Sequence, residues 1–291
     1  MLLGLLSACG NAPAHTDSGS TVALAGRTYI LKIPKGYDGS RPLPLVVAIH
    51  GYANDDGNTE SYFGLDPVAD ERDFFVVYPE GTVDAAGQRF FNGTDACCDF
   101  FHTGIDDVAF IDALVDDVEA KFAIDPARVY SVGHSNGGFL SYRLACERSS
   151  RFAAIVSLEA AMWNDPSRCQ PTEPVAILEA HGTNDVIISP AGGDVVDNYP
   201  NFVYPPLAQT MADWATLNGC SGGPSPVPGP GDIDSETSLP TTAQLWGGCR
   251  ADVELWTIAG GAHSPKLTAQ WPEAIVDFLM AHPKPAGSVQ H

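Results

Sequence analysis

Short runs of apolar residues alternate along this chain with longer stretches in which apolar positions recur at helical spacing. The short runs have the length and composition of buried strands. They lie at Arg27–Ile33, Leu45–His50, Phe74–Tyr78, Val129–Val132, Ala153–Ser157, Val175–Glu179 and Val253–Thr257. Because helical stretches fall between them, the pattern predicts an α/β fold with one mostly parallel sheet and helices on both faces.

Three helices are clear from the apolar spacing. The first begins near Asp106, and its inward face carries Val108, Ile111, Val115, Val118 and Phe122. Asp106 or Asp107 is placed to cap its first turn. The second follows Ser135, and the third spans Pro272–Ala281, where the proline suits a first turn.

A segment rich in proline and glycine, residues 221–231, interrupts this alternation. Its sequence, SGGPSPVPGPG, predicts a surface loop and not a core element. A linker between two domains is the alternative, but the strand pattern resumes at Val253 and needs the earlier strands to complete a sheet. We therefore expect a single domain over residues 22–283, followed by a short tail at 284–291.

The first residues indicate export. Leu2–Leu6 is an apolar run far shorter than the roughly 20 residues that span a membrane. The following Leu6-Ser7-Ala8-Cys9 resembles a bacterial lipoprotein processing box, in which Cys9 is lipidated. Residues 1–21 are then a leader and a flexible tether. We expect a secreted, periplasmic or cell-surface bacterial protein, and both lipidation and simple secretion stay open.

The charge and the cysteine content limit the classes of partner and ligand that we expect. The formal net charge is −21, which disfavours binding to nucleic acid or to anionic lipid. Any membrane contact is expected through the N-terminal lipid alone. Besides Cys9 the chain has an even set of cysteines, which suits an oxidising compartment. Their spacing fits no metal site, so we expect no metal. We also expect a monomer.

The segment Gly133-His134-Ser135-Asn136-Gly137 carries the clearest chemical signal. It has the pattern G-x-S-x-G, and it lies between a predicted strand and a predicted helix. In α/β-hydrolases this context is the nucleophile elbow, a sharp turn that exposes the serine. Ser135 is therefore the candidate nucleophile, and an ordinary turn serine is the alternative.

An acid and a histidine follow in the order that this fold uses. Asp185 lies just after the strand-like ILEAHG, and His263 lies just after the strand-like VELWTIAG. Functional loops of an open α/β sheet gather at the carboxyl ends of its strands. We expect His263 to take the proton of Ser135 and Asp185 to orient His263. The rival acids are Glu159 and Asp194, and the rival histidines are His181, His134, His102 and His50. His181 is expected to tie the Gly182–Asp185 turn.

An oxyanion would need two backbone donors at this site. The elbow offers the N–H of Asn136, at the start of a helix. The loop after the Leu45–His50 strand offers the N–H of Tyr52, next to a flexible Gly51. An ordinary strand-end turn at Gly51-Tyr52 is the alternative.

Several segments together resemble a known family. They are RPLPLVVAIHGY, CCDF, GIDDVAFIDALVDDV, IDPARVYSVGHSNGGFLSYRLAC, FAAIVSLEAAMW, HGTND and GGAHSP. This set, from Gly26 to Ala281, resembles the secreted polyhydroxybutyrate depolymerase/feruloyl esterase-like group of α/β-hydrolases, which includes carbohydrate-esterase-family-1-like enzymes. The resemblance implies a serine ester hydrolase without a cofactor and a triad of Ser135, Asp185 and His263. Ser264-Pro265-Lys266 and EAAMW depart from the group's usual segments, which bears on the substrate.

The expected topology pairs the cysteines. Cys146 is at the far end of the helix after Ser135, and Cys169 precedes a strand that starts at the same edge. Since a disulfide needs Cα atoms within about 7 Å, Cys146 is expected to pair with Cys169 and not with Cys97 or Cys98. Cys220 and Cys249 would close the Pro/Gly loop. Cys97 and Cys98 are expected to form a vicinal disulfide, with two free thiols as the alternative.

Loops that meet above Ser135 supply candidates for the substrate pocket. They are Tyr52, Phe100, Phe101, Met162, Trp163 and Tyr199, and each has ordinary loop packing as its alternative. An aromatic cleft suits phenolic acyl groups or polyester chains. We expect hydrolysis of feruloyl, aryl or polyester-type esters, including polyhydroxybutyrate and aromatic polyesters, through an acyl-enzyme. An acetylxylan-type deacetylase, a serine peptidase and an inactive carbohydrate-binding or adhesion module are the alternatives.

Overall fold

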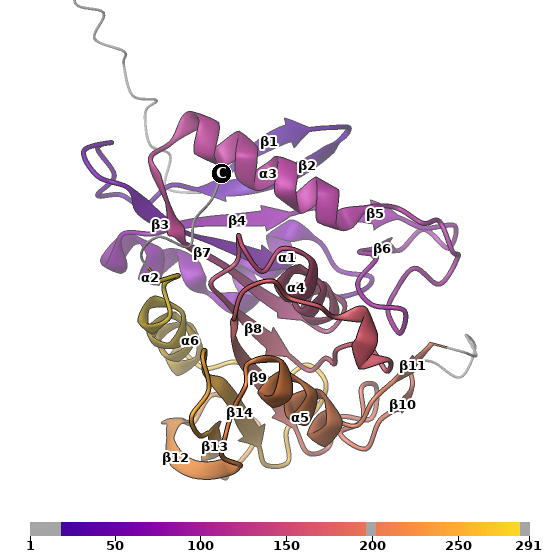
Figure 1. The fold of residues 1–291 in the computed structure, drawn as a ribbon. Coiled ribbons are helices and arrows are strands. Elements are labelled where there is room, and N and C mark those ends of the chain that lie inside the picture. Colours follow the sequence, from indigo (N-terminus) through magenta and orange to yellow (C-terminus); the bar gives the residue numbers. More distant parts are fainter. Residues whose placement is uncertain (1–18, 196–201, 286–291) are drawn as a thin grey trace, which may run out of the picture.

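A sheet of ten strands organises the computed structural model, which describes residues 19–195 and 202–285 (Figure 1). Across the sheet the strands run β1-β2-β4-β3-β7-β8-β9-β14-β13-β12. Their bounds are β1 Ser20–Leu24, β2 Arg27–Lys32, β3 Leu43–Ile49, β4 Phe75–Pro79, β7 Ile124–His134, β8 Ala154–Leu158, β9 Ala176–Gly182, β12 Pro224–Gly231, β13 Thr241–Trp246 and β14 Val253–Ile258. The six central strands, from β4 to β14, are parallel to one another. The outer strands are antiparallel, so the predicted α/β-hydrolase architecture is confirmed.

The helices cover the two faces of this sheet (Figure 1). Their bounds are α1 Asp56–Phe63, α2 Leu65–Arg72, α3 Asp107–Lys121, α4 Asn136–Glu147, α5 Leu207–Leu217 and α6 Gln270–Ala281. One apolar cluster joins α1, α2 and α6 to the sheet through residues such as Phe63, Val68 and Trp271. Clusters that contain Val115 of α3, Leu144 of α4 and Trp214 of α5 cover the other face. Two short ribbons, β5 Thr82–Val83 with β6 Arg89–Phe90 and β10 Gly193–Asp194 with β11 Val203–Tyr204, and a 3₁₀ helix at Pro166–Arg168 lie outside the large sheet.

Every predicted strand and helix is present, with ends shifted by a few residues. Strands β3, β4, β8 and β9 are buried along their whole length, as expected where helices cover both faces of a parallel sheet. The α3 helix begins after Asp106, whose carboxylate accepts the N–H of Ala109 at 2.9 Å. Of the two predicted caps, the structure therefore uses Asp106.

The structure differs from the prediction at the two ends of the domain. Residues Ser20–Leu24, expected to belong to the tether or the domain edge, form β1 and pair with β2 across a tight turn. Ala25 and Gly26 both have positive φ, which is the conformation of a two-residue hairpin turn. At the other end Lys284, expected in the tail, is buried and lies 3.1 Å from Glu173. Cys9 lies outside the described residues.

The Pro/Gly segment is a strand and not a loop. Residues Pro224–Gly231 form β12, which pairs antiparallel with β13 at one edge of the sheet. Pro224 and Pro226 alternate with Ser225 and Val227 where β12 pairs in register with β13, so they share one orientation there; the register shifts between Val227 and Gly231. The intervening residues keep their N–H groups for the ladder, which is why proline is tolerated in this edge strand. The segment is largely exposed, as expected.

Three disulfides are present, and they are the predicted pairs. Cys146 at the end of α4 bonds to Cys169, with their Cα atoms 5.0 Å apart. Cys220 bonds to Cys249, and Cys97 bonds to its neighbour Cys98. Among the described helices none is both long and apolar enough to cross a membrane.

Candidate active site

The turn between β7 and α4 holds Ser135 in a strained backbone conformation. Its φ is 53° and its ψ is −118°, outside the regions that a residue with a Cβ normally adopts. A Cβ at Gly133 would lie 2.1 Å from the carbonyl oxygen of Gly137, and a Cβ at Gly137 would lie 2.2 Å from that of Ile49. Only glycine fits at these two positions. The G-x-S-x-G segment therefore packs as an elbow.

Ser135, His263 and Asp185 form a hydrogen-bonded series. His263 Nε2 lies 2.9 Å from Ser135 Oγ, and His263 Nδ1 lies 2.8 Å from Asp185 Oδ2. Asp185 is in the loop after β9 and His263 is in the loop after β14, so neighbouring strand ends bring them to the elbow. Asp185 Oδ1 accepts the N–H groups of Ile187 at 2.8 Å and Ile188 at 2.9 Å.

This arrangement can move a proton between Ser135 and His263. Burial raises the pKa of Asp185, but the hydrogen bond and charge of His263 outweigh it and hold that pKa below its ordinary value. Asp185 therefore stays ionised and stabilises an imidazolium at His263. A serine that has given its proton to the ring is a nucleophile.

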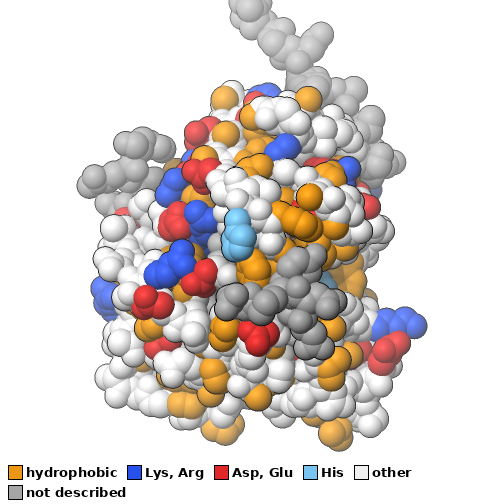
Figure 2. All heavy atoms as spheres, turned by 90° about the vertical axis from the view of Figure 1, so that its right-hand side faces the viewer, with side chains coloured by type: hydrophobic (Ala, Val, Ile, Leu, Met, Phe, Trp, Pro, Cys, Tyr) orange, Lys and Arg blue, Asp and Glu red, His pale blue; other side chains and the backbone are white. Residues whose placement is uncertain are grey.

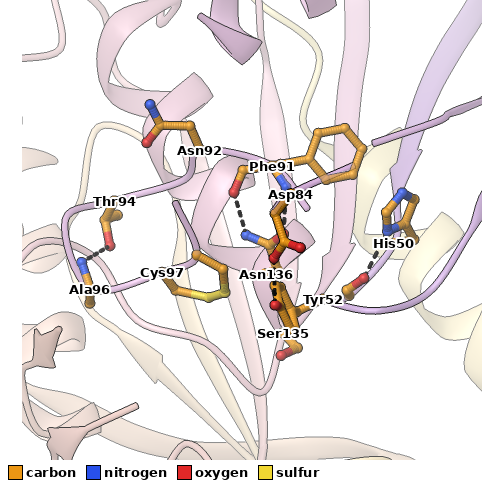
Figure 3. The surroundings of a disulfide bond; sticks show 12 residues. His50, Tyr52, Asp84, Phe91, Asn92, Thr94, Ala96, Cys97, Ser135 and Asn136 are labelled. Atoms are coloured by element: carbon orange, nitrogen blue, oxygen red, sulfur yellow. Dashed lines mark hydrogen bonds between the residues drawn. A yellow bond between two sulfur atoms is a disulfide. The ribbon is translucent and has the colours of Figure 1, made fainter. Parts of the chain in front are cut away.

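The two predicted oxyanion donors lie on segments that adjoin the elbow. A Cβ at Gly51 would lie 3.5 Å from the Cβ of Ser135, so the loop that carries Tyr52 passes next to the nucleophile. Asn136 is the first residue of α4. Its side-chain amide bonds both the N–H and the carbonyl of Phe91 at 2.7 Å (Figure 3). The Asn136 side chain thus fixes a neighbouring loop, which sequence reasoning missed.

Some predicted pocket aromatics lie together and others do not. The rings of Tyr52 and Phe100 pack edge to face, with centroids 5.1 Å apart. Both belong to a cluster that also contains the Cys97–Cys98 disulfide, next to the elbow (Figure 3). Phe101 is exposed in the same loop.

Met162 and Trp163 belong to a different apolar cluster from Tyr52 and Phe100. Met162 is fully buried in the core cluster beneath α4 and α5, so the structure puts it away from any open surface. Trp163 is also nearly buried, with Arg168 above its ring. The expectation that Met162 lines an open pocket is not met, because EAAMW turns back into the core. Tyr199 lies outside the described residues.

Two hollows open near these loops. The first, of about 480 Å³, is lined by Asn92, Gly93, Thr94, Asp95, Asp99, His102, Arg143, Trp163, Arg168 and Phe202. The second, of about 510 Å³, is lined by Asn54, Asn58, Ser61, Tyr62, His134 and Ser264. His134 and Ser264 directly adjoin Ser135 and His263 in the chain, so the second hollow borders the candidate triad. Figure 2 shows the face of the molecule at the right of Figure 1, where charged side chains of both signs gather beside hydrophobic ones.

Sequence reasoning also missed a buried polar cluster next to Asp185. It consists of Glu159 at the end of β8 with Glu179 and His181 of β9. Ligand atoms of Glu159, His181 and Asp185 lie within 4.8 Å of one another. Both ring nitrogens of His181 are already hydrogen-bonded, to Glu179 and to the carbonyl of Ile188, so no lone pair is left for a cation. The bond to Ile188 shows that His181 ties the loop beyond the predicted Gly182–Asp185 turn.

His134 gives a prediction for the pH dependence of folding. Its Nε2 lies 2.7 Å from the carbonyl oxygen of His263, and burial lowers its pKa to about 4. The unfolded chain binds a proton near the ordinary pKa of about 6.5, whereas the folded protein binds one only near 4. Above pH 6.5 the ring is neutral in both states and the stability does not depend on it. As the pH falls from about 6.5 to 4, we expect this histidine to reduce the free energy of unfolding by about 3 kcal/mol.

Denaturant unfolding between pH 8 and pH 4 checks this expectation. His134→Gln keeps a donor for the carbonyl of His263 but does not titrate, so its stability should fall less over that range. Parallel pH profiles for the two proteins would show that His134 is not the cause.

Comparisons with known proteins give the following relatives. Residues 27–192 match the protein family described as esterase PHB depolymerase. A probable feruloyl esterase C of Aspergillus terreus is 34% identical over 194 residues, which are 64% of this chain and 64% of that protein. Feruloyl esterase C of Emericella nidulans is 30% identical over 283 residues, which are 94% of this chain and 90% of that protein.

Solved structures share the fold. An acetyl xylan esterase from Aspergillus awamori superposes with a TM-score of 0.62 at 15% identity, covering 88% of this chain and 99% of that one. A CE1 ferulic acid esterase from Anaeromyces mucronatus, solved with ferulic acid, has a TM-score of 0.55 at 13% identity, covering 91% and 86%. At these identities the likeness concerns the arrangement of strands and helices.

Proposed function

Because this chain belongs to the esterase PHB depolymerase family, we propose that it is a serine carboxylesterase that cleaves feruloyl, aryl or polyester-type esters through an acyl-enzyme on Ser135. One observation carries the proposal. His263 bridges Ser135 Oγ at 2.9 Å and Asp185 Oδ2 at 2.8 Å, at the carboxyl ends of three parallel strands. The proposed chemistry requires neither a metal nor a cofactor.

The reaction follows from this geometry. His263 Nε2 accepts the proton of Ser135 while Oγ forms a bond to the ester carbonyl carbon. The carbonyl oxygen becomes an oxyanion, which the N–H groups of Tyr52 and Asn136 stabilise. The carbon–oxygen bond to the alcohol then breaks, and the alcohol leaves with the proton held by His263. A water molecule repeats these steps on the acyl-enzyme and releases the acid.

The choice of substrate rests on relatives and on the aromatic side chains. The two relatives described above are named as feruloyl esterases, at 34% and 30% identity. Tyr52 and Phe100 present packed rings next to the elbow, and Phe101 is exposed in the same loop. Planar aryl groups bind well against the exposed surface of such rings. We therefore infer a preference for aryl acyl groups over acetyl.

The three disulfides support a location outside the reducing cytoplasm. The enzyme is therefore exported and meets its ester substrate there. One chain is sufficient for the proposed chemistry, since the whole hydrogen-bonded series lies within it.

A panel of substrates tests the proposal. Purified enzyme is assayed on a p-nitrophenyl ester, methyl ferulate, acetylated xylan, polyhydroxybutyrate, an aromatic polyester film and the amide of ferulic acid. We expect turnover of methyl ferulate above acetylated xylan, and no turnover of the amide. A fluorophosphonate should stop all turnover and add its mass to the peptide that contains Ser135. Silence on every ester would refute the esterase, and preference for the amide would indicate a peptidase.

A further inference from the structure

Asp185 has three buried ionisable neighbours that the reaction above does not use. Glu159 and Glu179 have no exposed surface, and His181 is 3% exposed. The groups that face Glu159 are Asp185, His181, Glu179 and Tyr62, whose pKa is raised by burial and then by Glu159. Such a concentration of acids in a buried space must hold protons or be paired.

His181 carries both of its ring protons. Nδ1 lies 2.8 Å from a carboxylate oxygen of Glu179, and Nε2 lies 2.8 Å from the carbonyl oxygen of Ile188. Both partners are acceptors, whereas a neutral imidazole has one donor nitrogen. Burial lowers the pKa of His181, but the hydrogen bond and charge of Glu179 raise it above its ordinary value. His181 is therefore an imidazolium, and the carboxylate of Glu179 balances its charge.

The two oxygens of Glu159 are held differently. One accepts the N–H of Gly182 at 2.7 Å. The other, Oε2, lies 3.2 Å from His181 Nε2, but that nitrogen gives its proton to the carbonyl of Ile188, so Oε2 accepts no hydrogen bond among the described residues. A carboxylate oxygen of Glu159 and one of Asp185 lie within 4.8 Å of each other.

Asp185 has no proton to offer Glu159. Its Oδ1 accepts the N–H groups of Ile187 and Ile188, and its Oδ2 faces His263. His181 brings one positive charge, with Nε2 3.2 Å from Glu159 Oε2 and 3.7 Å from Asp185 Oδ2, and it is shared with Glu179. One cation cannot balance three buried carboxylates, so Glu159 and Asp185 would repel each other if both were ionised. One of the pair must therefore be protonated, and Asp185 is the one whose partners favour the ionised form.

We propose that Glu159 stays protonated at neutral pH and donates a hydrogen bond to Asp185. Glu159 is thereby a positioning residue of the triad, a role that rests on the function proposed for Asp185. The backbone supports this role, because Glu159 has a φ of 58°, a conformation that is rare for glutamate and persists where surrounding contacts hold it. Burial, and then the neighbouring Asp185, raise the pKa of Glu159 well above its usual range.

The proton on Glu159 gives Asp185 a further hydrogen-bond donor, besides the backbone N–H groups and His263. It fixes the carboxylate in the plane that faces His263. Burial raises the pKa of Asp185, whereas the hydrogen bonds from His263 and from Glu159 lower it. A less basic Asp185 leaves the transferred proton on His263, where the leaving alcohol collects it. Glu159 thus acts on the reaction only through Asp185.

Two substitutions separate this role from a structural one. Glu159→Gln supplies a neutral donor, so we expect kcat/KM within about threefold of wild type and an unmoved acidic limb of its pH profile. Glu159→Leu removes the donor, and we expect a loss of about 10- to 100-fold, mainly in kcat, as Asp185 shifts. If Glu159 were ionised, Glu159→Gln would remove a negative charge near His263 and move the acidic limb to lower pH. That shift, or full activity of Glu159→Leu, would overturn the proposal.

Infrared spectra test the proton without any activity. Protein with ¹³C-labelled glutamate is compared at pH 8 in the wild-type and Ser135→Ala forms. We expect the carbonyl band of a protonated glutamate in both, and its loss in Glu159→Gln. Burial also raises the pKa values of Glu60 and Glu254, so Glu60→Gln/Glu254→Gln is the control that should keep the band.

The control variant keeps the test decisive if Glu159→Gln does not fold. A band that survives both Glu60→Gln/Glu254→Gln and Glu179→Gln then supports a protonated Glu159. A band that disappears in either of these controls, or is absent from the wild type, refutes the proposal even in an active esterase. An inactive protein that shows the band would instead refute the esterase and leave the proton on Glu159 established.

Discussion

Ser135→Ala is expected to lower kcat on a p-nitrophenyl ester by about a million-fold. The substitution removes the oxygen that lies 2.9 Å from His263 Nε2, and with it the atom that forms the acyl-enzyme. Binding and the oxyanion donors remain, so a residual rate above that in water should persist. Initial rates at saturating substrate, together with a thermal unfolding curve, measure the effect and show that the variant is folded.

A buried serine in β7, the strand that leads into the elbow, is the matched control. The hydroxyl oxygens of Ser131 and Ser141 lie 2.8 Å apart inside the core, beneath the elbow. Ser131→Ala removes a hydroxyl of the same size without touching the triad, so its kcat should stay within about threefold of wild type. If Ser135→Ala retained even about one hundredth of the activity, another group would have to be the nucleophile.

Asp185→Asn is expected to reduce kcat by about ten thousand-fold. The amide can place an N–H where Oδ2 now accepts from His263 Nδ1, which forces the ring into the tautomer that cannot accept the proton of Ser135. The backbone N–H groups of Ile187 and Ile188 still bind the amide oxygen, so the loop keeps its shape. Rates measured across the pH range should stay low, since raising the pH does not restore the tautomer.

The rival acid Asp194 provides the control. It is exposed in β10, and Asp194→Asn should leave kcat unchanged. Comparable losses in both variants would mean that charge near the site, and not the hydrogen bond at 2.8 Å, governs the rate.

The central strands and the elbow could be predicted because their signals are local. A buried parallel strand shows as a continuous apolar run, and G-x-S-x-G between such a run and a helix is typical of a nucleophile elbow. Asp185 and His263 could be placed because each directly follows a strand, and chain order assigns their roles. Cys146 could likewise be paired with Cys169, because it lies at the end of α4 that is far from Ser135.

The missed features depend on contacts between distant segments. Helices α1 and α2 have eight residues each, with few apolar positions to give a period. The position of Met162 depends on which way the chain turns after β8, and no local pattern records that direction. The cluster around Glu159 arises from two neighbouring strands, so its pairing is visible only once the sheet is assembled.

The alternating prolines of β12 affect the tendency of the protein to aggregate at high concentration. Edge strands invite pairing with other chains through unpaired N–H groups. Where β12 pairs in register with β13, Pro224 and Pro226 alternate with Ser225 and Val227 and have no N–H to offer. The register shifts after Val227, and Pro228 and Pro230 in that stretch also lack an N–H. A second sheet that approached this edge would find no row of donors, so the enzyme is protected there against growth into aggregates.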